Sequence, residues 1–269
     1  MGMMEVSIIM GVHNCSETLA EAIDSILDQT FTDWELILCD DGSSDATFEV
    51  AQSYQHDHPE KIVLLQNETN MGLNYTLNRC LSKARGRFIA RMDGDDVSCP
   101  TRLEQEYAFL ESHPEYAIVS TPMICFDERG AWGRGTGGGK VEPLDFIKGT
   151  PFCHAPCMVR REAYKSVDGY STDSRTLRAE DYDLWFRMYE KGYRGYVLSD
   201  PLYKMRDDQN AYHRRKLKYS LNEVHVRFMG YRRLHLPIWA YPYALRPILI
   251  AMIPKPVYMY LHHKKKAAR

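Results

Sequence analysis

Residues 34–45 read WELILCDDGSSD, an apolar run that ends in two aspartates and a turn rich in Gly and Ser. A run of this length, bounded by turn-forming residues, is typical of a buried strand. Similar strand patterns occur at 5–12, 61–67, 87–93 and 116–126, and helical patterns separate them near 17–28, 46–55, 72–84 and 101–112. This alternation predicts βαβ units, and therefore an α/β fold with a Rossmann-like, mostly parallel sheet covered by helices on both faces.

Acidic residues follow two of the predicted strands. Asp40 and Asp41 end the second strand, and the stretch MDGDD at the end of the fourth contains Asp93, Asp95 and Asp96. In an open parallel sheet, ligands bind outside the carboxyl ends of the strands. We therefore expect both acidic groups to lie on the same edge of the sheet, around one cleft.

The MDGDD stretch predicts a metal site. Its crowded carboxylates repel one another, so folding alone gives little reason to place them there. A hard divalent cation relieves this repulsion, because Mg²⁺ and Mn²⁺ prefer carboxylate oxygens and usually bind substrate phosphates as well. A nucleoside diphosphate is therefore the expected ligand. The stretch DDGSSD, taken alone, is more simply interpreted as a turn.

Two common nucleotide-binding signatures are missing. The chain has no Walker-type phosphate loop, and no G-x-G-x-x-G follows the first predicted strand, which ends GVHNCSETL. This argues against an ATPase and against a dinucleotide-dependent oxidoreductase. The Gly-rich stretch GAWGRGTGGGK (130–140) has no strand-to-helix setting. We interpret it as a connection, either a mobile lid or an inert linker.

Composition excludes a globally basic protein. Lys and Arg number 34 and Asp and Glu number 36, a formal net charge of −2 in 269 residues, so no nucleic-acid partner is expected. The seven Cys are scattered and odd in number, and the first residues lack a charged-then-apolar leader. Both features favour a reducing cytoplasm. Cys153 and Cys157 flank His154, but no second pair lies nearby, so buried thiols are the preferred interpretation over a zinc site.

The C-terminal stretch PIWAYPYALRPILIAMIPKPVYMYLHHKKKAAR (237–269) differs from the rest of the chain. A membrane-spanning helix needs about 20 uninterrupted apolar residues, and prolines and basic residues break this run. Aromatic residues such as Tyr258 and Tyr260, flanked by Lys264–Lys266, are typical of a segment in the lipid headgroup layer. The alternative is that this tail packs on the catalytic domain as ordinary core.

Four stretches together carry a resemblance to a known family: VSIIMGVHN, WELILCDDGSSD, GLNYTLNRCLSKARGRFIARMDGDD and AEDYDLWFRM. In this order and spacing the chain resembles the family 2 glycosyltransferases, and most of all the bacterial enzymes that build exopolysaccharide, capsule or biofilm matrix. The resemblance implies a GT-A catalytic domain at 1–207, with a nucleotide-sugar-binding half at 1–127 and an acceptor half at 140–207. Residues 208–269 are then a C-terminal helical extension that contacts the membrane.

The resemblance also implies roles for residues near the nucleoside. Gly11, Val12 and His13, which follow the first strand, line the pocket of the nucleoside in such enzymes. The second Asp of DDGSSD, which is Asp41 here, faces the base. Uridine is the base that the resemblance favours.

Further implied roles concern the metal and the diphosphate. The D-x-D pair falls on Asp93 and Asp95, with Asp95 as the direct ligand of Mn²⁺ or Mg²⁺, and Asp96 holds the loop. Basic residues after the next strand approach the diphosphate in the family, which indicates Arg206 first and Lys204 second. The commoner family pattern has a His and Ser residues after that Arg, and this chain departs from it.

The acceptor half supplies the candidate catalytic residues. RTLRAEDYDLWFRMYEKGY predicts a helix that begins near Ala179, with Glu180 and Asp181 in its first turn. Acids there can simply complement the helix dipole. The resemblance implies that Asp181 is the general base that deprotonates the acceptor hydroxyl. His154 either contacts the acceptor or is a packed, hydrogen-bonded residue.

The resulting hypothesis is an inverting, metal-dependent glycosyltransferase of the hexosyltransferase type. It moves a sugar from a UDP-sugar to a growing oligosaccharide on a polyprenyl diphosphate, at the inner face of the cell membrane. Two alternatives stay open. A sugar nucleotidyltransferase also needs a metal and a nucleotide, but normally carries a Gly- and Lys/Arg-rich loop after its first strand. A non-enzymatic regulatory protein could use the same scaffold to bind a partner.

Overall fold

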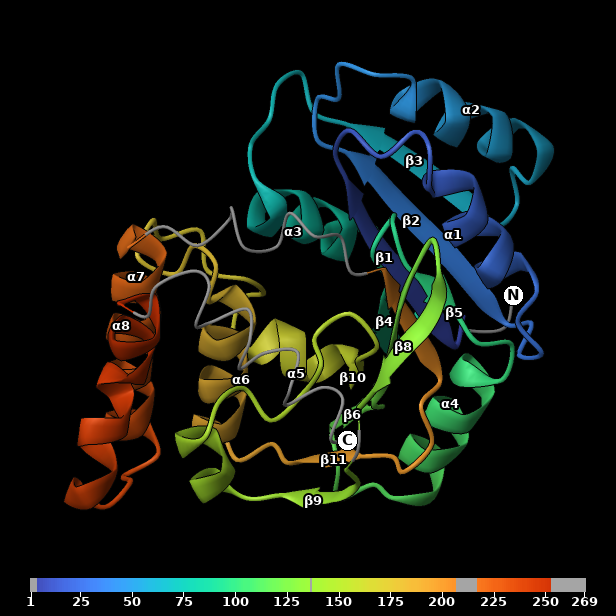
Figure 1. Cartoon of the computed structure of the whole chain (residues 1–269). Helices are drawn as coiled ribbons and strands as arrows, with labels where there is room; N and C mark the ends of the chain where they lie inside the picture. The colour runs from blue at the N-terminus through green and yellow to red at the C-terminus, as the bar shows by residue number, and fades with distance from the viewer. Residues whose placement is uncertain (1–3, 136, 207–216, 253–269) are drawn as a thin grey trace.

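The computed structural model describes residues 4–135, 137–206 and 217–252 (Figure 1). Their strands form two sheets, one of eight strands in the order β3-β2-β1-β4-β10-β6-β11-β9 and one of four in the order β5-β12-β7-β8. The larger sheet is mostly parallel, as the sequence predicts. Both predicted halves, 1–127 and 140–207, contribute strands to it, so the division between them stays a prediction.

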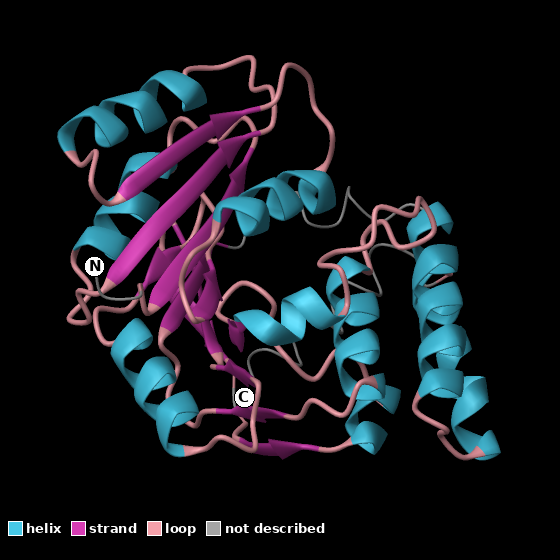
Figure 2. Ribbon diagram, turned by 180° about the vertical axis from the view of Figure 1, so that it is seen from behind, coloured by secondary structure: helices cyan, strands magenta, loops and turns pink. Residues whose placement is uncertain are grey.

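The N-terminal part of the larger sheet follows the predicted βαβ pattern. Its parallel strands are β1 (Val6–Val12), β2 (Trp34–Asp40), β3 (Ile62–Gln66) and β4 (Phe88–Arg91). The helices that connect them are α1 (Leu19–Leu27), α2 (Thr47–Asp57) and α3 (Leu73–Lys83). All seven residues of β2 are buried, because helices cover the sheet on both faces (Figure 2).

Alternate residues of β1 enter two separate cores. Ile8 and Met10 pack in the cluster that contains the apolar residues of α1 and of α4 (Arg102–Ser112). Ile9 packs in the other cluster, with Leu77 of α3 and residues of α6 (Glu180–Glu190). Successive side chains of a strand point to opposite faces of the sheet. Both faces of β1 are therefore buried, each in its own core.

The remaining elements complete the two sheets. To the larger sheet belong β6 (Ile118–Ser120), β9 (Gly139–Val141), β10 (Met158–Arg160) and β11 (Gly195–Val197). The smaller sheet contains β5 (Val97–Ser98), β7 (Met123–Asp127), β8 (Gly130–Arg134) and β12 (Tyr203–Arg206). Two short helices accompany them, η1 (Pro143–Ile147) and α5 (Arg161–Ser166).

The predicted strand at 116–126 is wrong as a single element. It divides into β6 and β7, which belong to different sheets. Pro122 lies at the break and has no N–H to donate to a ladder. The Thr121 hydroxyl next to it accepts the N–H of Leu202 at 3.0 Å and donates to the carbonyl of Asp200. These contacts turn the chain from one sheet into the other.

The interpretation of 130–140 as a lid or linker is also wrong. Gly130–Arg134 forms β8, which pairs antiparallel with β7, and Gly139–Val141 forms β9 at the edge of the larger sheet. The turn between β7 and β8 has Gly130 at φ 110° and an Asp127 carboxylate that accepts the N–H of Arg129 at 2.8 Å. The backbone hydrogen bonds between β7 and β8 therefore hold this Gly-rich stretch in a hairpin, although its small side chains offer little packing.

The C-terminal elements are α7 (Leu217–Arg233), η3 (Ile238–Leu245) and α8 (Arg246–Ala251). Helix α7 runs parallel to α6: Asn222 bonds the carbonyl of Leu177, and Arg227 lies over the ring of Tyr182. Further along, a Cβ on Gly230 would lie 2.2 Å from the Phe186 ring, so only Gly permits this approach. The described part of the tail thus packs on α6, as the alternative interpretation expected.

The other side of the tail remains exposed. Large apolar side chains of η3 and α8 face solvent, and we call them the C-terminal apolar surface: Ile238, Trp239, Tyr243, Leu245, Leu249 and Met252. Within the described ranges, no helix combines the length and the hydropathy that crossing a bilayer requires. Tyr258, Tyr260 and Lys264–Lys266, on which the headgroup interpretation partly depended, lie outside the described residues.

Candidate functional site

The loops after β1, β2 and β4 meet at one edge of the larger sheet. These three strands are parallel, so their carboxyl ends lie together. The N–H of Asp41 donates to the carbonyl of Val12 at 2.8 Å, and a Cβ on Gly94 would lie 2.7 Å from Val12 Cγ1. The two acidic groups therefore flank the end of β1.

A pocket of about 360 Å³ opens at this edge. From the loops of the sheet it is lined by Gly11, Val12, His13 and Asp41. Its other wall comes from the chain around the start of α6 and from α7, namely Leu177, Arg178, Glu180 and Tyr219. The four residues assigned to the nucleoside by resemblance thus lie in one cavity, which we call the nucleoside pocket.

Asp41 organises the wall of the nucleoside pocket. Its carboxylate accepts the N–H groups of Met71 and Gly72, both at 2.8 Å, and Asn67 Nδ2 at 2.6 Å. It therefore fixes the loop that leads into α3. The Gly72 backbone has φ 89°, a left-handed conformation that suits Gly. Contact of Asp41 with a base stays a prediction.

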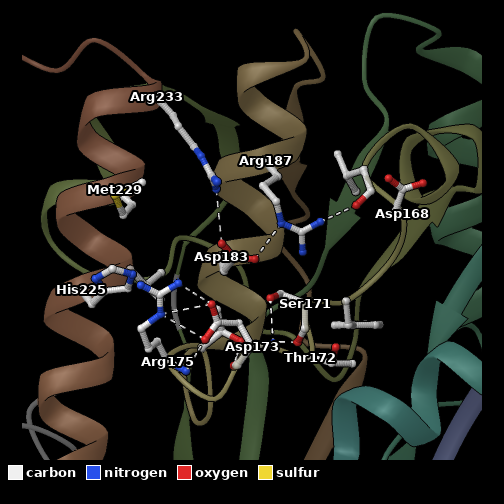
Figure 3. Close-up of a pocket in the computed structure, with 14 residues that line it drawn as sticks. Asp168, Ser171, Thr172, Asp173, Arg175, Asp183, Arg187, His225, Met229 and Arg233 are labelled. Carbon is white, nitrogen blue, oxygen red and sulfur yellow. Dashed lines mark hydrogen bonds and ion pairs between the residues drawn. The ribbon is translucent and has the colours of Figure 1, made fainter.

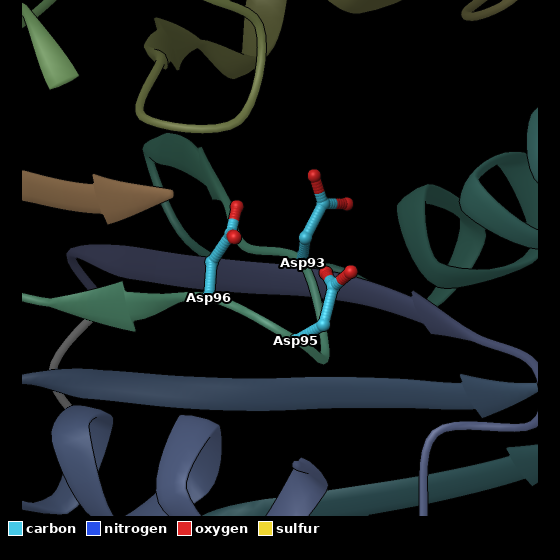
Figure 4. Close-up of side chains that lie close together, drawn as sticks. All are labelled: Asp93, Asp95 and Asp96. Carbon is cyan, nitrogen blue, oxygen red and sulfur yellow. The ribbon is translucent and has the colours of Figure 1, made fainter. Parts of the chain in front are cut away.

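The carboxylates of Asp93, Asp95 and Asp96 lie within 4.8 Å of one another (Figure 4). Asp93 forms a two-point ion pair with Arg91, with Nη–O distances of 3.0 and 2.5 Å. Asp96 is buried and accepts the N–H of Arg206 at 2.8 Å, so it secures the loop. Asp95 is exposed. Its position makes Asp95 the most accessible ligand of the three.

This cluster fits a hard divalent cation. Burial, together with the negative charges of Asp93 and Asp95, raises the pKa of Asp96 to about 8. Ionisation of all three carboxyl groups at once is therefore unfavourable, and a bound cation would relieve the repulsion. Carboxylate oxygens at this spacing are the donor set that Mn²⁺ and Mg²⁺ prefer.

Asp181 is the second residue of α6 and lies within electrostatic range of Arg91. Burial raises the pKa of Asp181 to about 7, the neighbouring Glu180 raises it as well, and the charge of Arg91 opposes them. Arg91 is thus within electrostatic range of Asp181 while it pairs with Asp93. Sequence reasoning missed Arg91. The available signal was a cation inside the apolar run RFIARMD, where a buried charge needs a partner.

His154 occupies a hydrogen-bonded position. Its Nε2 lies 2.8 Å from the hydroxyl of Tyr170, which in turn lies 3.1 Å from the hydroxyl of Tyr164. Burial holds the pKa of His154 well below its usual range, and Arg91 lowers it further, so the ring is neutral. This is the packed arrangement that the sequence left open, and direct contact with an acceptor stays a prediction.

Arg206 lies outside the lining of the nucleoside pocket. Its Nε donates to the carbonyl of Asp95 at 3.0 Å, its Nη2 pairs with Glu21 of α1, and its guanidinium lies 4.6 Å from the centre of the Phe126 ring. Arg206 therefore braces the D-x-D loop. Lys204 is exposed on β12. Contact of either residue with a diphosphate stays a prediction.

A second pocket, of about 400 Å³, lies between α6, α7 and the loop before α6 (Figure 3). Its arginines are paired with acids: Arg175 with Asp173 at 2.6 Å, and Arg187 with Asp183 at 2.7 Å. Arg233 of α7 also reaches Asp183, at 3.3 Å. Of these three pairs, the one between Arg233 and Asp183 joins α7 to α6.

Comparison with known proteins identifies the class. The family model "Glycosyl transferase family 2" matches residues 7–168, and the model "Glycosyl transferase family group 2" matches 88–262. The chain is 47% identical over 262 residues to the EpsE protein of Bacillus subtilis (strain 168), covering 97% of this chain and 94% of that one. The chain belongs to glycosyltransferase family 2.

Two further relatives align over most of both chains. The amylovoran biosynthesis glycosyltransferase AmsE of Erwinia amylovora is 29% identical over 227 residues, covering 82% of this chain and 83% of its own. WfaP of Escherichia coli, named as a UDP-Glc:alpha-D-GlcNAc-diphosphoundecaprenol beta-1,3-glucosyltransferase, is 26% identical over 250 residues. The latter match covers 91% of this chain and 94% of WfaP.

Solved structures agree on the fold. S. aureus TarS 1–349 in complex with UDP-GlcNAc superposes with a TM-score of 0.70 at 19% identity, covering 94% of this chain and 83% of that one. The Pyrobaculum calidifontis mannosyltransferase PcManGT, in complex with GDP-Man and Mn²⁺, superposes with a TM-score of 0.62 at 20% identity. The match covers 97% of this chain and 79% of PcManGT. The fold is GT-A.

Proposed function

We propose that the protein is an inverting, metal-dependent glycosyltransferase of polysaccharide synthesis. It transfers a sugar from a nucleoside-diphosphate donor, a UDP-sugar first, to a hydroxyl of a growing, lipid-linked oligosaccharide. One observation carries this proposal: the nucleoside pocket and the Asp93–Asp96 cluster share the rim of one sheet, and Asp181 lies within electrostatic range of Arg91, which pairs with Asp93.

Each step of the transfer has a candidate group. Mn²⁺ or Mg²⁺, when bound, supplies positive charge to the diphosphate leaving group. Asp95 and Asp93 hold the ion. Asp181 accepts the proton of the attacking hydroxyl, and its pKa of about 7 suits a general base at neutral pH. A single displacement from the opposite face of the sugar inverts C1, so an α-linked donor yields a β-glycoside.

Relatives support the substrate classes to different degrees. The names of AmsE and WfaP place those proteins in polymer or lipid-linked glycan synthesis. The TarS and PcManGT complexes contain different nucleosides, uridine and guanosine, so they favour a nucleotide-sugar without indicating which base this chain binds. The preference for uridine rests on the family resemblance of Gly11 to His13 and of Asp41.

A nucleotide panel tests this function. Purified protein is heated with UDP, GDP, their sugars, or nucleoside triphosphates, each with Mn²⁺ or with EDTA. We expect UDP and UDP-sugars with Mn²⁺ to raise the Tm most, and a UDP-sugar to release UDP slowly by hydrolysis. Pyrophosphate release from a triphosphate and a sugar phosphate would instead support a nucleotidyltransferase. A protein that binds none of these compounds would be the non-enzymatic alternative.

We also propose a peripheral contact with an anionic bilayer through residues 208–269. Ile238, Leu249 and Met252 are 87, 63 and 73% exposed, and apolar side chains this exposed gain free energy on entering lipid. Arg232 at the end of α7 and Arg246 at the start of α8 are also exposed, and they would attract anionic headgroups. This contact would bring the site to a lipid-linked acceptor.

Vesicle sedimentation tests the membrane contact. The double variant Ile238→Glu/Leu249→Glu should lose about tenfold or more of its affinity for vesicles of anionic lipid, because each charge must be desolvated. The matched control is Gln52→Glu/Gln105→Glu, which adds the same charge on the exposed sides of α2 and α4, away from α7 and α8 (Figure 1). Equal sedimentation of wild type and both variants would refute the contact.

A further inference from the structure

Arg178 and Tyr219 line the nucleoside pocket without an assigned role. Arg178 lies in the loop before α6, and Tyr219 lies in the first turn of α7. The guanidinium carbon of Arg178 is 5.9 Å from the centre of the Tyr219 ring, within the range of a cation–π contact. Two segments remote from the first strands therefore present a supported cation to the pocket.

The charges around the pocket explain why this cation matters. Among the described residues that line the pocket, Arg178 is the only Lys or Arg, whereas Asp41 and Glu180 are acids. No carboxylate of the described chain forms an ion pair with Arg178, although the neighbouring Arg175 pairs with Asp173 at 2.6 Å. A bound nucleoside diphosphate brings several negative charges, and the protein offers this guanidinium to meet them.

The backbone of Arg178 is held in an unfavourable conformation. Its φ is 67°, in the left-handed region that favours Gly. The side chain is exposed, so core packing does not explain an arginine here. A strained backbone under an exposed cation, which forms no ion pair within the described part of the chain, is typical of a binding residue.

The cation expected from the sequence does not occupy this place. Arg206 is engaged by Glu21, by the carbonyl of Asp95 and by Phe126, and it does not line the nucleoside pocket. We propose that Arg178 pairs with the diphosphate of the donor, and that the Tyr219 ring holds its guanidinium in position. This inference rests on the proposed function, because it takes the nucleoside pocket to receive a nucleotide.

The test compares a charged ligand with an uncharged one. UDP binding is measured by calorimetry and uridine binding by ligand-observed NMR, for wild type and for Arg178→Gln. A charge-assisted hydrogen bond is lost only with UDP, so we expect UDP affinity to fall about tenfold or more while uridine affinity is unchanged. Arg175→Gln, in the same loop but outside the nucleoside pocket, is the matched control and should bind both ligands like wild type.

Stability without ligand provides an independent readout. Arg178→Gly relieves the positive φ, so its Tm should equal or exceed that of wild type while its UDP affinity falls as far as that of Arg178→Gln. Tyr219→Phe keeps the ring and should bind UDP normally, whereas Tyr219→Leu should bind it more weakly. A residue with only a structural role would lose stability on substitution instead.

The outcomes separate the inference from the function on which it rests. Wild-type UDP affinity in Arg178→Gln overturns the inference alone. An equal loss of UDP and uridine affinity overturns the assignment to the diphosphate. A wild-type protein that binds no nucleotide overturns the inference and the proposed function together.

Discussion

Asp181→Asn should abolish sugar transfer and leave donor binding nearly intact. Asparagine has the shape of aspartate but cannot accept the proton of the acceptor hydroxyl, and loss of a general base costs about 10²–10⁴-fold in rate. Asp181 is not among the residues that line the nucleoside pocket. The measurements are the rate of acceptor-dependent UDP release and, separately, the Kd of UDP with Mn²⁺.

The pH dependence gives this prediction a second readout. Burial and Glu180 raise the pKa of Asp181 to about 7, so the group is protonated and inactive below that pH and active above it. We expect kcat/KM to rise as pH increases through about 7. Glu180→Gln removes the negative neighbour, which should shift this midpoint to lower pH without abolishing transfer.

The folding stability should fall over the pH range in which kcat/KM rises. A carboxyl group whose pKa is raised by folding binds more protons in the folded state than in the unfolded state between about pH 4 and 7. Its contribution to stability is therefore lost as pH rises through that window. Asp181→Asn should show a flatter profile of Tm against pH. Normal transfer by this variant would refute the assignment of the base.

Asp95→Asn should remove the metal-dependent part of nucleotide binding. Asp95 is the exposed carboxylate of the cluster, and an amide oxygen carries no charge with which to hold a cation. Substitutions outside the ligand shell already weaken metal sites about 10–100-fold, so loss of a ligand should cost at least that much. The measurement is the Kd of UDP in Mn²⁺ and in EDTA, whose difference should vanish.

A charge-matched control accompanies this variant. Asp57→Asn removes an exposed carboxylate at the end of α2, outside the cluster and the nucleoside pocket. Its Mn²⁺-dependent gain in UDP affinity should equal that of wild type. Retention of the same gain in Asp95→Asn would mean that the ion, if it binds, is held elsewhere.

The sequence predicted those parts of the fold that local patterns determine. The strands β1, β2 and β4 are buried and mostly apolar because helices cover both faces of the sheet, and this makes the βαβ repeat readable. The rim of acids followed from the same pattern, since parallel strands place Asp41 and Asp95 at the same edge. β1 begins one residue after the start of its predicted range, and β2 ends at Asp40 rather than at Asp41.

Contacts between distant segments could not be read in this way. The bend at Pro122 depends on Asp200 and Leu202, and the β7–β8 hairpin depends on pairing rather than on side-chain pattern. The same limit applies to the site. Arg91 comes within electrostatic range of Asp181, and Arg178 meets the Tyr219 ring, only when the chain folds. Arg206 is likewise drawn to Glu21, which is remote in sequence.

The stacking of α6, α7 and α8 sets a minimum reach for the acceptor. Packed helices lie about 8–10 Å apart, and α7 contacts both α6 and α8. In the proposed contact with lipid, α8 faces the bilayer and α7 joins it to α6, the helix that carries Asp181. The reacting hydroxyl of a lipid-linked acceptor would then have to extend out of the headgroup layer to meet Asp181.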